Sequence, residues 1–365
     1  MNFQPIEEPT FNTDRAEQFA DTFSTVLNHG AIAAMASIGH RLGLFDLLLD
    51  HPGSSSEHLS EIADLSERYV REWLAVMVTG GVVLYDPATK SYILPAEHAA
   101  CLTHEAPYGN LAVYAQSVAL FGKVEERVLT AFRTGEGIPY GDYPCFHQIM
   151  SEDSGQTVVA GIDEIITSLM PDIVPRLNAG IDVLDAGCGA GLAAIRMAQL
   201  YPQSRFKGID LCEDAISMAV ASAKACRITN VSFEVRDLTE FEDVHTYDLI
   251  TSFDAVHDMK DPQSLLSSYH RALRPGGVHL MQDIGGSAQL ENNLDFPFAA
   301  FLYAISCTHC TPVSLAQGGE GLGTMWGWET AEAMLRSAGF TDVTRTVLPH
   351  DPMNVWFVNR KELVG

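Results

Sequence analysis

The chain has 365 residues, of which 47% are hydrophobic and 19% are charged. This length predicts about two domains, and this composition excludes a chain that is mainly disordered. The 22 basic residues are outnumbered by 47 acidic ones, and the resulting net charge of -25 argues against nucleic acids and anionic membranes as partners.

Cysteine usage and the first residues bear on the compartment. Seven cysteines, an odd number at irregular spacing, predict reduced thiols and not a disulfide framework. Residues 1–8 lack the basic and apolar stretches of a signal peptide, and we find no apolar run of about 18 residues, the length that a membrane span needs. We therefore expect a soluble, cytoplasmic protein without a membrane partner.

Apolar residues up to about position 165 have mostly helical spacing. Intervals of three and four predict a helix over residues 31–49 with one buried face. Two shorter helices are predicted over residues 57–63 and 66–79, and Ser66 is the expected N-cap of the second.

A hairpin is predicted next, with strands at residues 82–85 and 92–94 around a turn. Helices followed by a hairpin form a winged helix, a fold that many DNA-binding proteins contain. Residues 1–165, however, contain 8 basic and 23 acidic residues, a net charge of -15. DNA-binding domains show the opposite charge. We predict a helical winged-helix domain over residues 1–165 that forms a homodimer and binds no nucleic acid. The alternative is a transcriptional regulator with a ligand-sensing second domain.

Short apolar runs alternate with helices from about residue 180 onward. Helices are predicted over residues 190–200 and 213–226, and the strand candidates are residues 181–185, 205–210, 231–235, 247–251 and 277–281. This alternation predicts an α/β fold whose parallel sheet is covered on both faces. Ligands of such sheets bind at the carboxyl ends of the strands.

The first two of these strands end in residues suited to a nucleoside. A Gly-x-Gly-x-Gly turn occupies residues 187–191, and Asp210 follows 19 residues later, where a carboxylate can hold ribose hydroxyls. NAD would also suit these features, but Leu192 replaces the third small residue of a dinucleotide fingerprint. Asp185 would moreover repel a pyrophosphate. A cationic ligand without phosphate, such as S-adenosylmethionine, removes that objection.

Four segments then occur in a characteristic order, at residues 183–191, 208–210, 236–238 and 273–277. In this order they resemble the class I S-adenosylmethionine-dependent methyltransferases, and the likeness extends over residues 175–361. It implies a Rossmann-like, seven-stranded methyltransferase domain over residues 166–365 that ends in an antiparallel strand pair, residues 343–348 and 354–358. The cofactor-binding residues that it implies are Asp185, Gly187, Gly189, Gly191, Asp210, Leu211, Asp237, Leu238, Phe253 and Asp254.

His257 and Asp258 follow the fourth strand. Together with the winged helix, this pair resembles that of the small-molecule O-methyltransferases, in which the histidine acts as a base. A closer resemblance, through residues 34–48, 314–319 and 321–327, is to uncharacterised bacterial winged-helix methyltransferases. These likenesses imply methyl transfer to a small molecule, through a phenolic or enolic hydroxyl. A histidine of ordinary pKa suits deprotonation of such a group, so we expect His257 to be the general base, with a structural histidine as the alternative.

Aromatic residues between the fifth strand and the last helix predict a lid over the acceptor, near residues 290–328. Phe301 and Trp326 within it, and Tyr143 and His147 in the preceding linker, are the expected substrate contacts. The Cys-Thr-His-Cys sequence at residues 307–310 places two cysteines on one helical face. Because no second ligand pair has suitable spacing, we expect buried thiols and no metal.

Overall fold

The computed structural model describes residues 10–107, 109–144 and 146–363. The residues expected to lack a signal peptide, 1–8, lie outside this range. The chain forms two compact units whose boundary falls between Lys123 and Val124, well before the expected position 165. The difference arises because side chains between residues 158 and 170, among them Val158 and Ile162, belong to the same buried cluster as the second unit's sheet.

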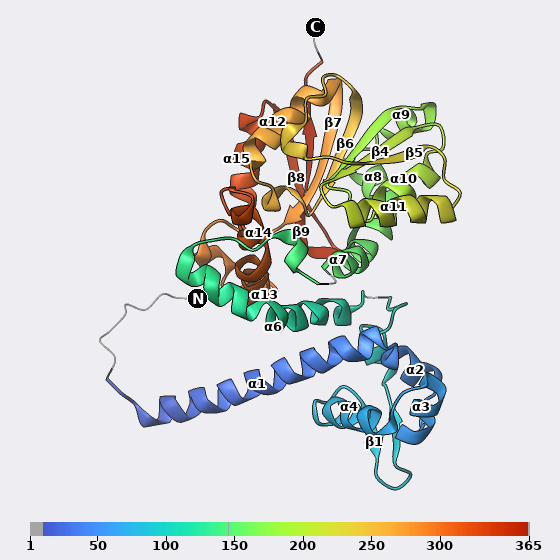
Figure 1. Ribbon diagram of the computed structural model, residues 1–365, viewed down its shortest axis with the longest axis vertical. Helices are drawn as coiled ribbons and strands as arrows, with labels where there is room; N and C mark the ends of the chain where they lie inside the picture. The colour runs from blue at the N-terminus through green and yellow to red at the C-terminus, as the bar shows by residue number, and fades with distance from the viewer. Residues whose placement is uncertain (1–9, 108, 145, 364–365) are drawn as a thin grey trace. The chain divides into compact units, whose positions relative to one another are not determined.

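The first unit has the order of elements that was predicted for a winged helix (Figure 1). Its elements are α1 (Thr13–Arg41), α2 (Leu44–Asp50), α3 (Ser56–Ala63), α4 (Glu67–Thr79), β1 (Leu84–Asp86), β2 (Ser91–Ile93) and α5 (Ala96–Ala99). The strands β1 and β2 pair antiparallel, as expected for the hairpin. The single helix expected over residues 31–49 is instead two helices, because Gly43 adopts a positive φ of 67° and starts a new one.

Trp73 holds the helices of this unit together. Its indole nitrogen donates a hydrogen bond of 2.8 Å to the carbonyl of Met35, and its ring lies 5.3 Å from that of Phe45. A Cβ atom at Gly39 would lie 2.4 Å from the Trp73 ring, so α1 can approach α4 only with glycine there. Ser66 occupies the N-cap position of α4, as predicted, although its hydroxyl makes no capping hydrogen bond.

The second unit contains a seven-stranded sheet in the order β5-β4-β3-β6-β7-β9-β8. Five strands run parallel, and β8 and β9 form the antiparallel pair that was expected at the end. The strands are β3 (Asp182–Ala186), β4 (Arg205–Asp210), β5 (Val231–Val235), β6 (Tyr247–Phe253), β7 (Leu273–Ile284), β8 (Asp342–Leu348) and β9 (Asp351–Arg360). The prediction of an α/β fold is therefore confirmed, and β7 is longer than the expected residues 277–281.

Helices cover both faces of this sheet (Figure 1). The helices from α6 onward, not all of which lie on a face of the sheet, are in chain order α6 (Leu111–Thr134), in which the unit boundary falls, η1 (Tyr140–Asp142), α7 (Phe146–Ser154), η2 (Gly155–Val159), α8 (Ile162–Leu169), α9 (Val174–Ala179), α10 (Leu192–Leu200), α11 (Glu213–Ala225), η3 (Leu238–Glu240), η4 (Val256–Asp258), α12 (Pro262–Ala272), η5 (Leu290–Asn293), α13 (Ala299–Ile305), η6 (Ser306–Cys310), α14 (Thr311–Ala316) and α15 (Trp328–Ser337). Neighbouring residues Val183 and Leu184 are both buried but belong to different hydrophobic clusters. This is the pattern of a parallel strand packed on both sides.

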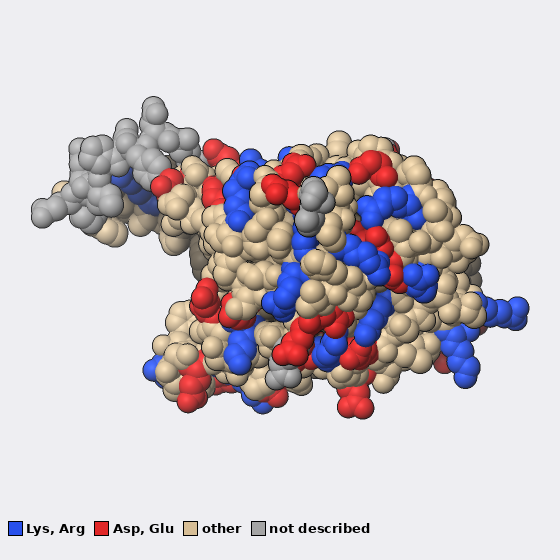
Figure 2. Space-filling model, turned by 90° about the horizontal axis from the view of Figure 1, so that it is seen from above, with Lys and Arg blue, Asp and Glu red and all other residues tan. Residues whose placement is uncertain are grey.

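Charged side chains of both signs are interspersed over the face shown in Figure 2. Local ion pairs are frequent in the second unit. Arg176 pairs with Asp248 at 2.7 Å, and Arg274 pairs with Asp182 at 2.9 Å. These pairs are partly buried and lie away from the carboxyl ends of the strands, so we attach no functional role to them.

One stretch of the second unit, Ala299–Ala316, is long and apolar enough to cross a membrane by length and composition, with a mean hydropathy of 1.2. From the sequence alone we expected no apolar run of this length. The stretch buries the polar side chains of His309 and Ser314 inside the second unit. Core helices of globular proteins pass the same test, so this stretch is weak evidence for a span. The helix pair α1 and α2 also passes it when taken together, although the two are bent by 72°.

Candidate functional site

Four carboxyl groups lie at one edge of the sheet in the second unit. Since β3, β4, β6 and β7 are parallel and adjacent, their carboxyl ends meet there. Asp185 and Asp210 lie at the ends of β3 and β4, Asp254 follows β6, and Asp283 lies at the end of β7. This edge, where ligands of parallel sheets bind, is the candidate site.

The glycine-rich turn after β3 borders open space at this edge. Gly187 and Gly189 have φ values of 74° and 52°, a region that favours glycine. The Gly189 N–H donates to Asp210 Oδ2 at 2.9 Å, and a Cβ atom at Gly189 would meet nothing within 4 Å. Gly191 differs, because a Cβ atom there would lie 2.5 Å from the ring of Phe233. Gly189 is therefore free to face a ligand. Gly187 and Gly191 are required for packing, since a Cβ atom at Gly187 would lie 2.8 Å from the Cβ atom of Ala255.

Asp185 supplies a buried negative charge beside this turn. Its Oδ1 accepts a hydrogen bond of 2.8 Å from the Thr251 hydroxyl, whereas its Oδ2 is buried without a hydrogen-bond partner. Burial raises the pKa of this carboxyl to about 6. A buried carboxylate oxygen without a donor is costly unless a ligand satisfies it. The residues thus fit a ligand with a cationic group, as S-adenosylmethionine is, better than an anionic one.

The remaining predicted cofactor residues have mixed environments. Asp237 caps η3, because its Oδ1 accepts from the Thr239 N–H at 2.8 Å, and Leu238 is buried in the core. Leu211 is 56% exposed. Phe253 ends β6, and burial raises the pKa of the neighbouring Asp254, although His257 counteracts the shift. A cofactor role for these residues remains a prediction.

His257 lies in η4 between two carboxylates. Its Nδ1 is 2.9 Å from Asp283 Oδ1, an oxygen that also accepts a hydrogen bond of 3.0 Å from the indole of Trp326. Its Nε2 is 3.2 Å from Asp258 Oδ1. Burial by itself lowers the pKa of His257, but Asp283 and Asp258 outweigh this effect and hold the pKa well above its usual value. The two carboxylates therefore favour the protonated imidazole, and the expected role as a base requires the deprotonated form.

Aromatic rings cluster around His309, next to this pair. The Tyr143 hydroxyl donates to the carbonyl of Thr308 at 2.8 Å, and the ring of Phe146 stacks on that of His309 at 3.7 Å. His147 lies 3.0 Å from the thiol of Cys212, close in sequence to Asp210. The structure thus brings Tyr143 and His147 to the site.

Two further residues were expected to contact the substrate. Trp326 reaches the site through Asp283 and acts there as a hydrogen-bond donor. Phe301 lies on α13, where its ring is 6.3 Å from that of Phe298. Contact of either residue with a substrate remains a prediction.

Comparisons with known proteins agree with this geometry. Residues 30–104 match the Rv2258c-like winged HTH domain, and residues 177–339 match the Methyltransferase domain. The chain therefore contains a winged HTH domain followed by a methyltransferase domain. Phosphoethanolamine N-methyltransferase 1 of Triticum aestivum is 38% identical over 108 residues, which are 29% of this chain and 21% of that protein. The match therefore covers about a fifth of that relative's length.

Solved structures share the fold at low sequence identity. A protein of Nostoc punctiforme described as an O-methyltransferase is 20% identical with a TM-score of 0.71, over 93% of this chain and 98% of that one. Human N-acetylserotonin methyltransferase, solved in complex with S-adenosylmethionine, is 16% identical with a TM-score of 0.64, over 98% of this chain and 100% of that one. At these identities the likeness establishes the fold of this chain and nothing further.

Three residues at the site of the methyltransferase were not predicted: Asp283, His309 and Cys310. The predicted fifth strand stopped at residue 281, two positions before Asp283, so its end was misplaced. The expectation of two cysteines on one helical face was wrong. Cys307 is exposed and Cys310 is buried, because η6 is a π-helix whose wider turn separates residues three apart. Burial lowers the pKa of His309 to about 4, so this imidazole is neutral.

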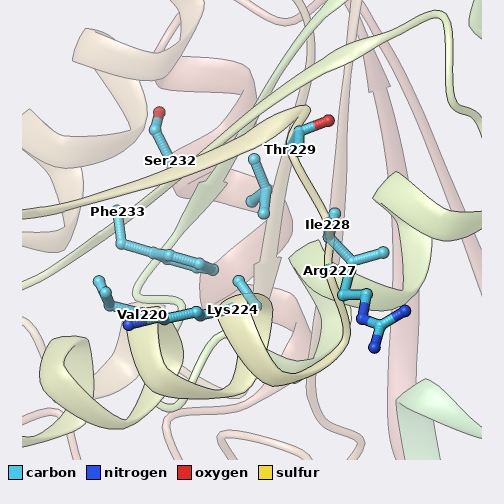
Figure 3. Close-up of a pocket in the computed structure, with 9 residues that line it drawn as sticks. Val220, Lys224, Arg227, Ile228, Thr229, Ser232 and Phe233 are labelled. Carbon is cyan, nitrogen blue, oxygen red and sulfur yellow. The ribbon is translucent and has the colours of Figure 1, made fainter.

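A separate hollow of about 460 Å³ lies between α11 and β5 (Figure 3). In Figure 3 the ring of Phe233 extends across it, and Lys224 and Arg227 project from the end of α11. Phe233 is also the residue that packs against Gly191. None of the acidic residues of the site lines the hollow, so we assign the chemistry to the strand ends.

The pKa of Asp185 predicts how cofactor binding by the methyltransferase depends on pH. Below about pH 6 this carboxyl is protonated and no longer presents a negative charge to a cationic ligand. Binding then releases one proton, so the affinity for S-adenosylmethionine should fall about tenfold for each pH unit below this pKa.

Calorimetric titration on both sides of the pKa measures this dependence. The titratable groups facing Asp185 are Asp210, Cys188 and Tyr269, and burial raises the pKa of the last two far above this range. An affinity that does not change between the two conditions would contradict the role of Asp185.

Proposed function

We propose that this methyltransferase transfers the methyl group of S-adenosylmethionine to the hydroxyl oxygen of a small phenolic or enolic acceptor in the cytoplasm. One observation carries the proposal: the unpartnered carboxylate oxygen of buried Asp185 and the buried His257–Asp283 pair lie at the same edge of one sheet. The first suits a cationic methyl donor, and the second suits the activation of an acceptor. The free thiols of the described cysteines are consistent with a reducing compartment.

Bound S-adenosylmethionine supplies an electrophilic methyl group for an in-line displacement. The chain contributes by positioning, which can lower the barrier by about 7–11 kcal/mol. Gly189 leaves room for the donor, Gly187 lines it through its backbone, and Asp210 holds its ribose. Asp283 fixes the ring of His257 so that Nε2 faces Asp258. We infer that His257 reacts in its deprotonated form and that its Nε2 accepts the proton of the acceptor hydroxyl.

The aromatic residues near His309 complete the acceptor pocket in this proposal. Tyr143 is tied by its hydroxyl to the backbone of η6, so its ring is held in place. Trp326, Phe301 and His147 are proposed to contact the acceptor or to close over it. Apolar walls with few polar groups exclude water from the reacting atoms and favour an aromatic ligand. A screen of small phenols and enols for release of S-adenosylhomocysteine tests the proposed activity. Absence of release with every acceptor class would contradict it.

The first unit is proposed to form a homodimer through α1. This helix exposes apolar side chains at helical spacing, and Phe19 and Leu27 are 65% and 64% exposed. Contiguous apolar side chains exposed on one helix face commonly mark a protein interface. We expect the double variant Phe19→Asp with Phe23→Asp to be a monomer by light scattering, whereas the wild-type protein is a dimer. A wild-type monomer, or a variant that remains dimeric, would contradict this assignment.

A winged-helix regulator is the alternative reading, since the first unit matches a winged HTH domain. In α4 the charges pair within the helix: Arg68 binds Glu72, and Arg71 lies 3.4 Å from Glu67. Phosphate binding would have to break these pairs. We expect no DNA shift in a gel assay at physiological salt. Submicromolar binding that weakens with salt would favour the regulator.

A further inference from the structure

A cluster of side chains that could bind a metal ion lies next to the proposed acceptor pocket. His257, Asp258 and Cys310 offer ligand atoms that all lie within 4.8 Å of one another. A single ion with ligand bonds of about 2.0–2.3 Å can reach such a set after small side-chain rotations. We propose that these three side chains bind a divalent transition-metal ion of the zinc or iron(II) class.

The histidine of this set is already oriented as a metal ligand. Its Nδ1 faces Asp283 Oδ1 at 2.9 Å, and the Trp326 indole holds the same oxygen at 3.0 Å. A carboxylate on one ring nitrogen fixes the imidazole so that the other nitrogen points at the metal. Here that other nitrogen, Nε2, faces Asp258. The Asp283 carboxylate, the His257 imidazole and the proposed metal position therefore follow one another in this order.

The sulfur ligand comes from an irregular helix. Cys310 ends the π-helix η6 and is buried, and its Sγ lies 2.9 Å from the Thr324 hydroxyl. Such π-helical turns occur frequently at functional sites. The neighbouring His309 is also buried, with its Nδ1 3.7 Å from Asp258 Oδ2 and its Nε2 without a hydrogen-bond partner. His309 thus offers a fourth donor beside the same carboxylate.

The charge of the cluster calls for a cation. Asp254, Asp258 and Asp283 all lie within 4 Å of His257, and in the described part of the chain none of the three pairs with a lysine or an arginine. Asp258 Oδ1 is buried and accepts no hydrogen bond of ordinary geometry, with Nε2 of His257 at 3.2 Å. Imidazole, thiolate and carboxylate together suit zinc or iron(II), whereas magnesium and calcium prefer oxygen ligands alone.

The role of the ion rests on the proposed methyl transfer. A divalent ion that binds the acceptor hydroxyl lowers its pKa, so that the proton passes to solvent near neutral pH. The new oxygen–carbon bond then forms as the sulfur–carbon bond of the methyl donor breaks. No electron is exchanged. The ion would take the place of the proton on Nε2 of His257, so in the metal-bound protein the ion, and not His257, would activate the acceptor hydroxyl.

Cobalt(II) is the probe for this site. The full-length protein is treated with a chelator, titrated with cobalt(II), and followed by visible absorption and by metal analysis. We expect one bound ion per chain with sulfur-to-cobalt charge-transfer absorption. Cys310→Ser should abolish that absorption, and Asp258→Asn should abolish tight binding. Asp283→Asn, which loosens the ring of His257, should weaken binding about 10- to 100-fold. Cys307→Ser, an exposed cysteine on the same turn, is the matched control and should behave as wild type.

Calorimetry with S-adenosylmethionine on the same samples separates this proposal from the proposed function and shows that each variant is folded. Cobalt binding without the sulfur absorption, or binding that Cys310→Ser and Asp258→Asn leave unchanged, would overturn the metal site. Normal S-adenosylmethionine binding without any cobalt binding would overturn the metal site alone. Cobalt binding as expected without S-adenosylmethionine binding would support the metal site and overturn the methyl donor.

Discussion

Replacing His257 by Ala is expected to lower turnover by up to about 10⁴-fold, the upper range of what a positioned proton-transfer group contributes. The affinity for S-adenosylmethionine should stay nearly the same, because the cofactor residues Asp185 and Asp210 are untouched. His257 is buried and bound to Asp283, so its loss removes the group that prepares the acceptor and not the donor site. Release of S-adenosylhomocysteine with an acceptor from the phenol and enol screen measures the change.

Two further variants make this prediction specific. Asp283→Asn keeps His257 but weakens the hold on its ring, so it should lose part of the turnover at unchanged cofactor affinity. His350→Ala, an exposed histidine, serves as the control and should match wild type. Unchanged turnover in His257→Ala would show that this histidine has a structural role and is not the general base.

Replacing Asp210 by Ala is expected to have the largest effect on cofactor binding. Its carboxylate lies at the end of β4, where it accepts hydrogen bonds from Gly189 and Cys212, each at 2.9 Å, and retains capacity for the ribose hydroxyls. A hydrogen bond to a charged group contributes about 1.5–3 kcal/mol, so the dissociation constant for S-adenosylmethionine should rise about 10- to 150-fold.

The conservative variant separates charge from shape. Asp210→Asn keeps one acceptor oxygen and should lose less affinity than Asp210→Ala. Asp214→Asn, an exposed carboxyl on the first turn of α11, is the matched control. Calorimetry gives all three constants directly. Equal affinities of Asp210→Ala and wild type would place the ribose elsewhere.

The hydrophobic periodicity of the sequence was sufficient to predict the strands of the sheet. It was insufficient to predict the irregular segments. The limits of β4 and β5 agree with the prediction, because buried parallel strands read as short apolar runs between helices. The helix expected over residues 31–49 is interrupted at Gly43, where a positive φ breaks a pattern that remains helical in sequence. The π-helix at η6 has no periodic signal at all, so the separation of Cys307 from Cys310 appears only in three dimensions.

The candidate site was predictable where one residue follows one strand. Asp185, Asp210 and His257 lie at strand ends and were found on that ground. Asp283 was missed because the predicted strand stopped before Ile284. His309 and Cys310 were missed as site residues because they approach Asp258 from a helix about fifty positions later in the chain, a contact that sequence spacing does not encode.

The most direct measurement of the central claim is calorimetric titration of the full-length protein with S-adenosylmethionine, S-adenosylhomocysteine and NAD. The acidic residues at Asp185 and Asp210 predict that the first two bind with one site per chain and that NAD does not bind. Binding of NAD, or failure of both S-adenosyl compounds to bind, would contradict the account.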